Sequence, residues 1–522
     1  MKRNLIGREM NSLQKQRLFK LFSLMLALAF CLSGCSGVSQ SSPELKNVVL
    51  PDPAPALPRQ VLGDDSTMDA REVTLHYASQ NSVNLTTVTR TISVGRDESL
   101  VYNTLRELLS ANHGDIRRPV EANLVSLECG AGVATVNLSI EAGVNRSDQD
   151  YLTLCASIAN TLLGLDGIEA VNVLTGSRND PVARLPLGCF TAQQDNLAAA
   201  YAQAQSEAQR VLDEENGAFD RTVLLYFPAQ GGKYLLPEAR TLTFEDDSYI
   251  TAIINALSEG PRRECCFSAI PGNLELLASE PEIIATKAGE RIIELNFTST
   301  LANYLAFAGV EPWQLYGSIV LSLSSFVPEI DAVRISVDHE YVQDSTLRRN
   351  TIIFEDGLMR RDDFSPAIGS SALLYFANED GYLSAAECSM SQSAANSAVG
   401  LLTELLNPVN AYLPGLQSVF PDGIAQEDIL GVIIENRTAT VNLSGNFYAR
   451  CQGLSPQRER LLVYAMVNTL SELDHIGAVS FLVEGEQVDS LAQNIYLKTA
   501  LMPDPGLVQE AADSEESEVS IN

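Results

Sequence analysis

The sequence predicts an α+β protein made of three tandem copies of one module, each a small sheet covered on one face by two helices. The first observation is a repeated hexapeptide: residues 134–139 read ATVNLS, residues 439–444 are identical, and residues 293–298 form a looser third copy. The second is that apolar residues recur at helical spacing before and after each hexapeptide. One sheet face and two apolar helix stripes need a shared core, which an α+β sandwich provides.

Each copy is expected to begin with a short apolar and aromatic strand, at residues 74–77, 224–227 and 373–376. An amphipathic helix follows, because apolar side chains three and four residues apart fall on one helix face. These positions are Val101, Leu105, Leu108 and Leu109 in the first copy, Ile250, Ile253, Ile254 and Leu257 in the second, and Val399, Leu402, Leu405 and Leu406 in the third.

A hairpin comes next. In the first copy, strands at residues 124–129 and 133–138 flank a Gly-Ala-Gly turn, and we expect Gly130 and Gly132 to supply the positive φ that tight hairpins require. A second helix and a closing strand complete the unit. The second helix is apolar at Ile158 and Leu162, or at Leu462, Met466 and Leu470, and the closing strands are residues 170–174, 333–337 and 479–483.

We therefore predict domains at residues 71–178, 221–340 and 371–490. The Ala- and Gln-rich residues 190–217 are expected to form a connecting helix, and residues 341–370 an irregular linker. Relative movement of the domains is the default expectation for such an arrangement. At the ends, the proline-rich residues 35–70 predict an extended linker and the acidic residues 500–522 a disordered tail.

The N-terminus reads as a signal peptide over residues 1–34, with six basic residues and then an apolar run at residues 21–32. That run is shorter than the roughly twenty residues needed to span a bilayer. Residues 32–35, where this run ends, read LSGC, which resembles the lipobox of bacterial lipoproteins. The resemblance implies a diacylglycerylated Cys35 that holds the chain on the outer face of the cytoplasmic membrane. The alternative is an ordinary cysteine after a secretory signal.

The chain is strongly acidic, with a formal net charge of −31. Residues 1–34 hold six bases and one acid, so the remainder carries a formal charge of −36. Binding to a phosphate backbone requires clustered cations, and the sequence contains no basic stripe, so a nucleic-acid partner is not expected. Anionic lipid headgroups should likewise repel the body of the chain.

Seven cysteines remain besides Cys31 and Cys35, and an odd number cannot pair completely within one chain. No C-x-x-C motif occurs, and the adjacent pair at 265–266 does not have metal-site spacing. The pattern favours free, partly buried thiols, with one or two disulfides as the open alternative. The seven are Cys129, Cys155, Cys189, Cys265, Cys266, Cys388 and Cys451.

Several segments together resemble the GerMN domain, found in sporulation and germination proteins of spore-forming bacteria. They are the opening LYF strand, LSEGP at residues 257–261, the ATVNLS strand, VNTL at 467–470 and FLVEG at 481–485. The resemblance implies a fold like the ring-building motif of secretion channels and a role in envelope assembly during sporulation or germination. It supplies no catalytic residues.

The residues themselves predict no catalytic, cofactor or metal site. Neither a G-x-S-x-G motif nor a P-loop occurs, and the Gly-Ala-Gly turn only begins a dinucleotide-binding pattern. The histidines lack metal-ligand spacing, so we expect each at the surface or at a strand end, and we expect the aromatic residues in the core. The histidines are His76, His113, His339 and His475, and the aromatic residues are Tyr226, Phe227, Trp313, Tyr375 and Phe376.

These observations favour a non-enzymatic, membrane-anchored envelope lipoprotein that associates with envelope proteins or peptidoglycan. An exposed sheet edge could accept a partner strand or a second copy of the chain, which would give a homo-oligomer. Two rival functions stay open. An extracytoplasmic sensor or solute-binding lipoprotein would be stabilised by its ligand, and a cell-wall hydrolase would turn over peptidoglycan.

Overall fold

The computed structural model describes residues 69–509, except for short gaps at 80–83, 95–98, 111–115, 118, 142–145, 214–216, 246–247, 271, 273–276 and 408–412. The described residues belong to one compact unit that begins at Leu57. The predicted signal peptide, Cys35, the predicted linker up to residue 68 and the predicted tail from residue 510 lie outside them. No helix in the described part is long and apolar enough to cross a membrane.

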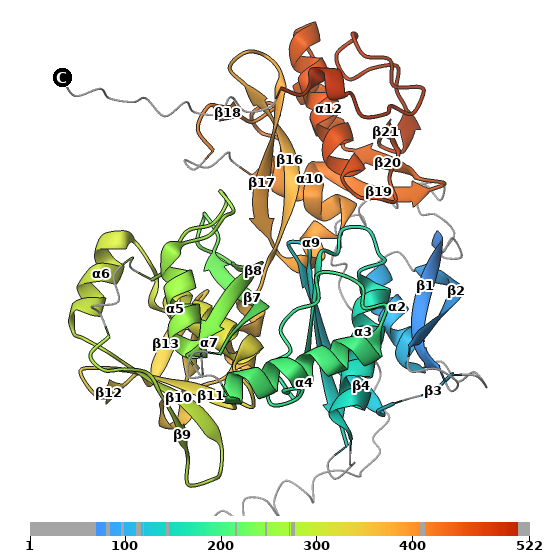
Figure 1. The fold of residues 1–522 in the computed structure, drawn as a ribbon. Coiled ribbons are helices and arrows are strands. Elements are labelled where there is room, and N and C mark those ends of the chain that lie inside the picture. Colours follow the sequence, from blue (N-terminus) through green and yellow to red (C-terminus); the bar gives the residue numbers. More distant parts are fainter. Residues whose placement is uncertain are drawn as a thin grey trace, which may run out of the picture. The chain divides into compact units, whose positions relative to one another are not determined.

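Repeat 1 (residues 69–196) sets the pattern, with the order β-β-α-β-β-α-β and one additional two-residue strand, β3, after its first helix (Figure 1). Its opening strand is one half of a hairpin, and β5 and β6 are parallel neighbours joined through α3. The elements are β1 (Asp69–Ser79), β2 (Leu85–Val94), α2 (Leu100–Ser110), β3 (Ile116–Arg117), β4 (Ala122–Gly130), β5 (Val133–Ile140), α3 (Asp148–Leu162) and β6 (Ala170–Thr175). Helix α4 (Leu197–Asp213) then leads to repeat 2; it lies within the segment predicted to connect the domains, residues 190–217, whose first residues instead pack on repeat 1.

Repeat 2 (residues 218–364) has the same order with an added helix and hairpin. The shared elements are β7 (Ala218–Pro228), β8 (Leu235–Glu245), α5 (Tyr249–Glu259), β9 (Glu282–Ala285), β10 (Arg291–Phe297), α7 (Pro312–Phe326) and β11 (Ala332–Val337). The others are α6 (Thr300–Ala308), β12 (Glu340–Tyr341), β13 (Asp344–Leu347), β14 (Asn350–Ile353), η2 (Glu355–Gly357), β15 (Leu358–Met359) and α8 (Arg361–Phe364), with η3 (Ser365–Ala367) leading into repeat 3.

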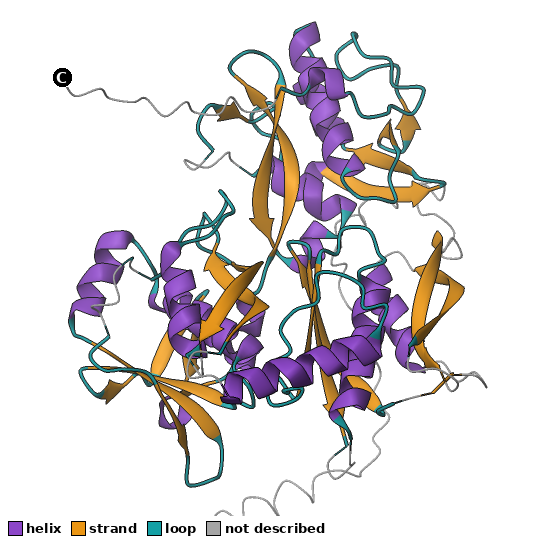
Figure 2. Ribbon diagram, viewed as in Figure 1, coloured by secondary structure: helices purple, strands orange, loops and turns teal. Residues whose placement is uncertain are grey.

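Repeat 3 (residues 370–509) repeats the order again, and Figure 2 shows helix α12 lying beside the strands β19–β21. Its elements are β16 (Ser370–Asn378), β17 (Leu383–Met390), α9 (Gln392–Ala395), α10 (Ala398–Leu406), β18 (Leu416–Gln417), η4 (Gln426–Asp428), β19 (Ile429–Glu435), β20 (Thr438–Leu443), α11 (Gly445–Cys451), α12 (Pro456–Ser471), β21 (Ala478–Val483), β22 (Glu486–Gln487) and η5 (Pro505–Leu507).

The predicted α+β class and the threefold repeat are confirmed, but the sheet differs in one respect. Hydrogen bonding separates the opening hairpin of each repeat from the sheet around the hexapeptide strand, and repeat 2 has a third sheet, the β13–β14 hairpin. The second strand of the opening hairpin was missed from the sequence. In repeat 1 this strand, β2, is half-exposed and rich in threonine and carries only one buried residue, Ile92, so it lacks a strong apolar signal.

The hairpin turn of repeat 1 also differs from its prediction. Positive φ values occur at Ala131 (54°) and Gly132 (78°), whereas Gly130 is the last paired residue of β4. A two-residue turn of this kind requires positive φ at both central positions. Repeat 3 makes the same turn with Asn436 (50°) and Arg437 (62°), so no glycine is needed there.

The asparagine of the hexapeptide secures the turn that follows the closing strand. In all three repeats its side-chain oxygen accepts a hydrogen bond from the backbone N–H of the second residue in that turn. Each of these donor residues has a positive φ. The bonds are Ser177 to Asn137 (2.8 Å), His339 to Asn296 (3.0 Å) and Gly485 to Asn442 (2.8 Å). The repeated asparagine therefore has a structural role.

A hydroxyl group on the second helix plays a matching role toward the opening strand. Thr161, Ser322 and Thr469 each accept a backbone N–H from the strand that their helix covers. The donors are His76 (2.9 Å), Tyr226 (3.0 Å) and Tyr375 (3.2 Å), which are equivalent positions. Buried backbone donors need such partners, which explains the threonine of the recurring Asn-Thr-Leu motif.

Every repeat ends in a strap, a segment that returns to pair with the closing strand. The same valine of that strand is opposed, antiparallel, by Phe190 in repeat 1, Met359 in repeat 2 and Leu501 in repeat 3. In repeats 1 and 3 the asparagine of the Asn-Thr-Leu motif also holds the strap, through Gln194 and Asp504. The strap is thus part of the repeated unit.

Two segments predicted to be outside the domains are therefore packed onto them. The predicted linker at residues 341–370 contains β13, β14, β15 and α8, and its Leu347, Phe354, Met359 and Phe364 are buried in the core of repeat 2. The predicted tail at 500–522 packs on repeat 3 through residues 501–509, with Leu507 buried. Single apolar residues among polar neighbours gave neither segment a periodic signal.

The buried aromatic residues follow the prediction, and one histidine does not. Tyr226, Phe227, Trp313 and Phe376 are buried, and Tyr375 is half-buried. His339 lies exposed in a turn after its strand, as expected, whereas His76 is buried in the middle of β1. Burial lowers the pKa of His76, although Asp195 and the Thr74 backbone oppose this shift. His475 is half-buried in a turn after α12, and His113 lies outside the described residues.

Candidate functional site

The junction between the repeats contains one of the buried charged residues of the molecule, Arg361. The sheet of repeat 1 packs its inner face on its own helices, while the alternate residues of its strands face outward. On that outer face Val133 and Ala170 belong to the same apolar cluster as the core of repeat 2. Thr135, Asn172 and Leu174 beside them are at most 3 % exposed. Repeat 2 therefore covers the outer face of repeat 1.

Arg361 stands at the centre of this contact. It begins helix α8, and it is only 4 % exposed. Its guanidinium donates to Glu128 of repeat 1 (2.5 Å) and, within repeat 2, to the Tyr226 hydroxyl (3.0 Å) and Ser325 (2.8 Å). A buried charge needs a partner and hydrogen bonds for its remaining donors, and Arg361 has both.

The electrostatics of this cluster keep the arginine charged. Burial by itself would lower the pKa of Arg361, but the nearby Tyr226 and Glu128 outweigh it and hold this pKa above its ordinary value. Burial raises the pKa of Tyr226, which therefore stays a neutral hydroxyl. The cluster is an ion pair that joins two repeats, with the arginine buried and the carboxylate 16 % exposed.

The Gly-Ala-Gly turn of repeat 1 reaches the segment that connects repeats 2 and 3. A Cβ atom on Gly130 would lie 2.4 Å from the carbonyl oxygen of Gly369, so glycine is required there by close backbone approach and not by φ. Next to it, the backbone N–H of Ala131 donates to Ser370 Oγ (3.3 Å). The turn therefore performs a packing role, as its hairpin context suggested.

One arginine of repeat 2 links all three repeats at the same place. Arg263 donates to the backbone oxygen of Ala131 in repeat 1 (2.7 Å) and forms an ion pair with Glu387 in repeat 3. Glu387 also accepts from the Ser371 hydroxyl (2.6 Å). About a quarter of each charged side chain is exposed, so this pair is less shielded than the pair of Arg361.

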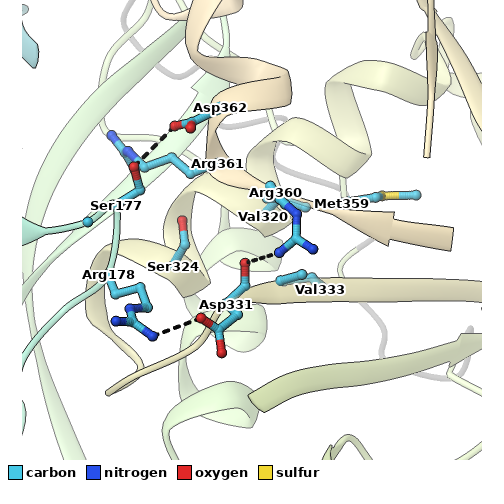
Figure 3. Close-up of a pocket in the computed structure, with 12 residues that line it drawn as sticks. Ser177, Arg178, Val320, Ser324, Asp331, Val333, Met359, Arg360, Arg361 and Asp362 are labelled. Carbon is cyan, nitrogen blue, oxygen red and sulfur yellow. Dashed lines mark hydrogen bonds and ion pairs between the residues drawn. The ribbon is translucent and has the colours of Figure 1, made fainter. Parts of the chain in front are cut away.

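A small cavity lies at the edge of the junction, between the last turn of repeat 1 and repeat 2 (Figure 3). Its volume is about 150 Å³. Ser177 donates to Asp362 across it (3.1 Å), and Arg178 pairs with Asp331 (2.8 Å). The third arginine on its wall, Arg360, donates to the Asp331 backbone oxygen (3.2 Å) and pairs with Glu290. The charged groups around the cavity are therefore engaged with one another.

The cysteines do not form a redox or metal centre within the described residues. All seven are unpaired, and no group of three or more His, Cys, Asp or Glu side chains there could hold a metal ion. The sulfur atoms of Cys265 and Cys266 lie 3.8 Å apart in the core of repeat 2. Their mutual hydrogen bond and burial raise the pKa of Cys265, and burial raises that of Cys155 to about 12, which disfavours reactive thiolates.

The sequence pointed to one functional residue, Cys35, and this residue lies outside the described part of the chain. The junction residues Glu128, Arg263, Arg361 and Glu387 were missed, because a sequence with this many charges gives no sign of which ones become buried. The arginines of the predicted linker at 341–370 were the only available signal, since several arginines in a segment between acidic domains suggest ionic partners.

The fold and this junction define a tandem-repeat α+β protein whose modules are joined by buried ion pairs and a glycine contact. Comparison with known families agrees with the repeat. The Germane family, described as sporulation and spore germination, matches residues 74–178, 224–343 and 373–489, so the chain belongs to this family. Each match ends before the strap that completes the corresponding repeat.

Solved structures give similar neighbours. The tandem GerMN domains of the sporulation protein GerM from Bacillus subtilis are 16% identical, with a TM-score of 0.22, over 56% of this chain and 100% of that one. The first GerMN domain of the same protein is 22% identical, with a TM-score of 0.22, over 26% of this chain and 96% of that one. No significant match is found among curated protein sequences.

Proposed function

We propose that this protein is a non-enzymatic envelope lipoprotein, tethered through a diacylglyceryl group on Cys35, that acts by protein association in sporulation or germination. Membership of a sporulation and spore germination family supports the process. The LSGC sequence after an apolar run supports the tether and a place on the outer face of the cytoplasmic membrane.

The observation that carries the proposal is the junction itself. The guanidinium groups of the buried Arg361 and of Arg263 are engaged in contacts between repeats. A catalytic site instead aims perturbed charged groups into a cleft that admits substrate. A rigid array of three modules on a lipid tether suits a protein that presents surfaces to envelope proteins or peptidoglycan.

The cavity of Figure 3 bears on the rival of a solute-binding lipoprotein. Its volume of about 150 Å³ is below the range of roughly 300–1,000 Å³ found for small-molecule sites. Its arginines are also occupied by Asp331 and Glu290. These features favour association between proteins over capture of an organic solute.

The test is the count of heat-resistant spores in a strain lacking the gene, complemented by the wild-type chain or by Cys35→Ala. We expect a large loss that only the wild-type chain restores. An unchanged count in the deletion strain would overturn the sporulation role, and full rescue by Cys35→Ala would overturn the tether. Turnover of purified peptidoglycan by the isolated protein would overturn the non-enzymatic assignment.

A further inference from the structure

The outer face of the repeat 3 sheet is open where the same face of repeat 1 is covered. The two hexapeptides align the two sheets residue by residue, and both sheets have the same parallel and antiparallel pairs. Five positions of the face are buried in repeat 1 and half-exposed in repeat 3. The pairs are Val133 and Thr438, Thr135 and Thr440, Ala170 and Ala478, Asn172 and Ser480, and Leu174 and Leu482.

The centre of the open face also lacks charge. Across β19, β20 and β21 the single charged residue is Glu435, which lies opposite Thr438 at the edge of this face. Repeat 1 places Glu128 in the middle of its face, where Arg361 of repeat 2 meets it, and the equivalent position in repeat 3 is Ile433. Repeat 2 carries an ion pair on its face, between Glu294 and Arg334 (2.8 Å).

We infer that the outer face of the repeat 3 sheet, centred on Thr440, Ser480 and Leu482, binds the same face of a second copy of this chain. The inference deepens the proposed function, on which it rests for the role of association, by naming the partner and the surface. The two sheets would pack face to face about a two-fold axis, as in a β-sandwich.

Charge makes this face the surface at which two copies can meet with least repulsion. A molecule with a net charge of −31 repels its own copies over most of its surface, whereas the centre of this face has no charge and its one carboxylate, Glu435, lies at the edge. An isologous contact sets this patch against itself, which places Ile433 and Leu482 against residues without charge. A partner that resembled repeat 2 would bring an arginine to this face, and the equivalent of its carboxylate partner Glu128 is here Ile433, so that arginine would lack an ionic partner.

The internal precedent shows that such a face can be buried stably. In repeat 1 the matched positions are at most 4 % exposed, and the neighbouring module excludes solvent from them. In the described residues, repeat 3 is followed by its strap and by no further module. Its outer face is therefore partly exposed, whereas the same face of repeat 1 is buried.

Cross-linking tests the contact directly. The chain from residue 57 onward, which contains the whole compact unit, is prepared with Thr440→Cys and treated with a bifunctional maleimide. We expect a covalent dimer. The matched control is Thr87→Cys, an exposed strand position of repeat 1, and the unsubstituted chain controls for the native thiols, of which only Cys129 and Cys189 are not fully buried. Equal dimer in all three proteins, or none with Thr440→Cys, would overturn the inference.

Sedimentation velocity provides a second measurement without a reagent. We expect Leu482→Lys, which brings two lysines into the contact by symmetry, to weaken dimerisation roughly tenfold or more. Ile353→Lys, which replaces an isoleucine that is 74 % exposed on the β13–β14 hairpin, should leave it unchanged. Unaltered far-UV circular dichroism verifies the fold of both variants. A monomeric wild-type chain at all concentrations would contradict the inference while leaving the spore-count result standing.

Discussion

The Arg361 guanidinium depends on one carboxylate from another repeat. If Glu128→Ala removes that carboxylate, a charge that is 4 % exposed remains without its ionic partner. Loss of one member of a buried pair typically costs about 3–5 kcal/mol. We therefore expect the free energy of unfolding, measured in urea, to fall by about this amount.

An exposed pair provides the control for that measurement. Asp489 pairs with Lys498, and the two side chains are 75 % and 46 % exposed. Pairs of this kind contribute about 0–1 kcal/mol, so Asp489→Ala should have little effect. Equal losses for Glu128→Ala and Asp489→Ala would mean that the Arg361 pair is not shielded from solvent.

Among the secondary-structure elements, the strap makes the sharpest prediction. Leu501 exchanges two backbone hydrogen bonds of 2.8 Å with Val479, and Leu507 is buried. Ending the chain after residue 499 removes Leu501 with its two hydrogen bonds and Leu507, although it leaves the whole third family match at 373–489 intact. We expect this truncation to lower the melting temperature, and truncation after residue 509 to leave it unchanged. Identical melting of both forms would show that the strap is not part of the folded unit.

The strap also shows where reasoning from the sequence stopped. Helices and strands with a buried, periodic face were predicted, as for Ile250, Ile253, Ile254 and Leu257 of α5, all of which are buried. A strap contributes a few scattered apolar residues and backbone bonds, without a periodic pattern, so its sequence looks like a linker or a tail. Strand β2 was missed for a related reason, since most of its residues are partly exposed and its pairing is determined by β1.

The junction could not be predicted, because it depends on contacts between residues far apart in the chain. Glu128 and Arg361 are separated by 233 positions. Glycine at position 130 suggested a turn with positive φ, whereas a side chain is excluded there because the carbonyl oxygen of Gly369, between repeats 2 and 3, lies too close. Local pattern defines a module, and only the docking of modules decides which polar residues become buried.

For the molecule as a whole, these contacts predict a cooperative unit in place of three independent domains. Trp313, the single tryptophan, lies in the core of repeat 2, so its fluorescence follows that repeat, whereas far-UV circular dichroism follows all three. In the wild-type chain we expect the two signals to give the same urea transition, which is the mark of two-state unfolding.

Gly130→Ala should separate these transitions. The new Cβ cannot remain 2.4 Å from the Gly369 oxygen, so the turn must move away and loosen the contact between repeat 1 and the segment joining repeats 2 and 3. Repeat 1 would then unfold at lower urea than repeat 2, and circular dichroism would change before fluorescence. Gly272→Ala, whose Cβ meets no atom within 4 Å, should keep the two curves together. Coincident curves in Gly130→Ala would mean that the covered sheet face, and not the turn, provides the coupling between the repeats.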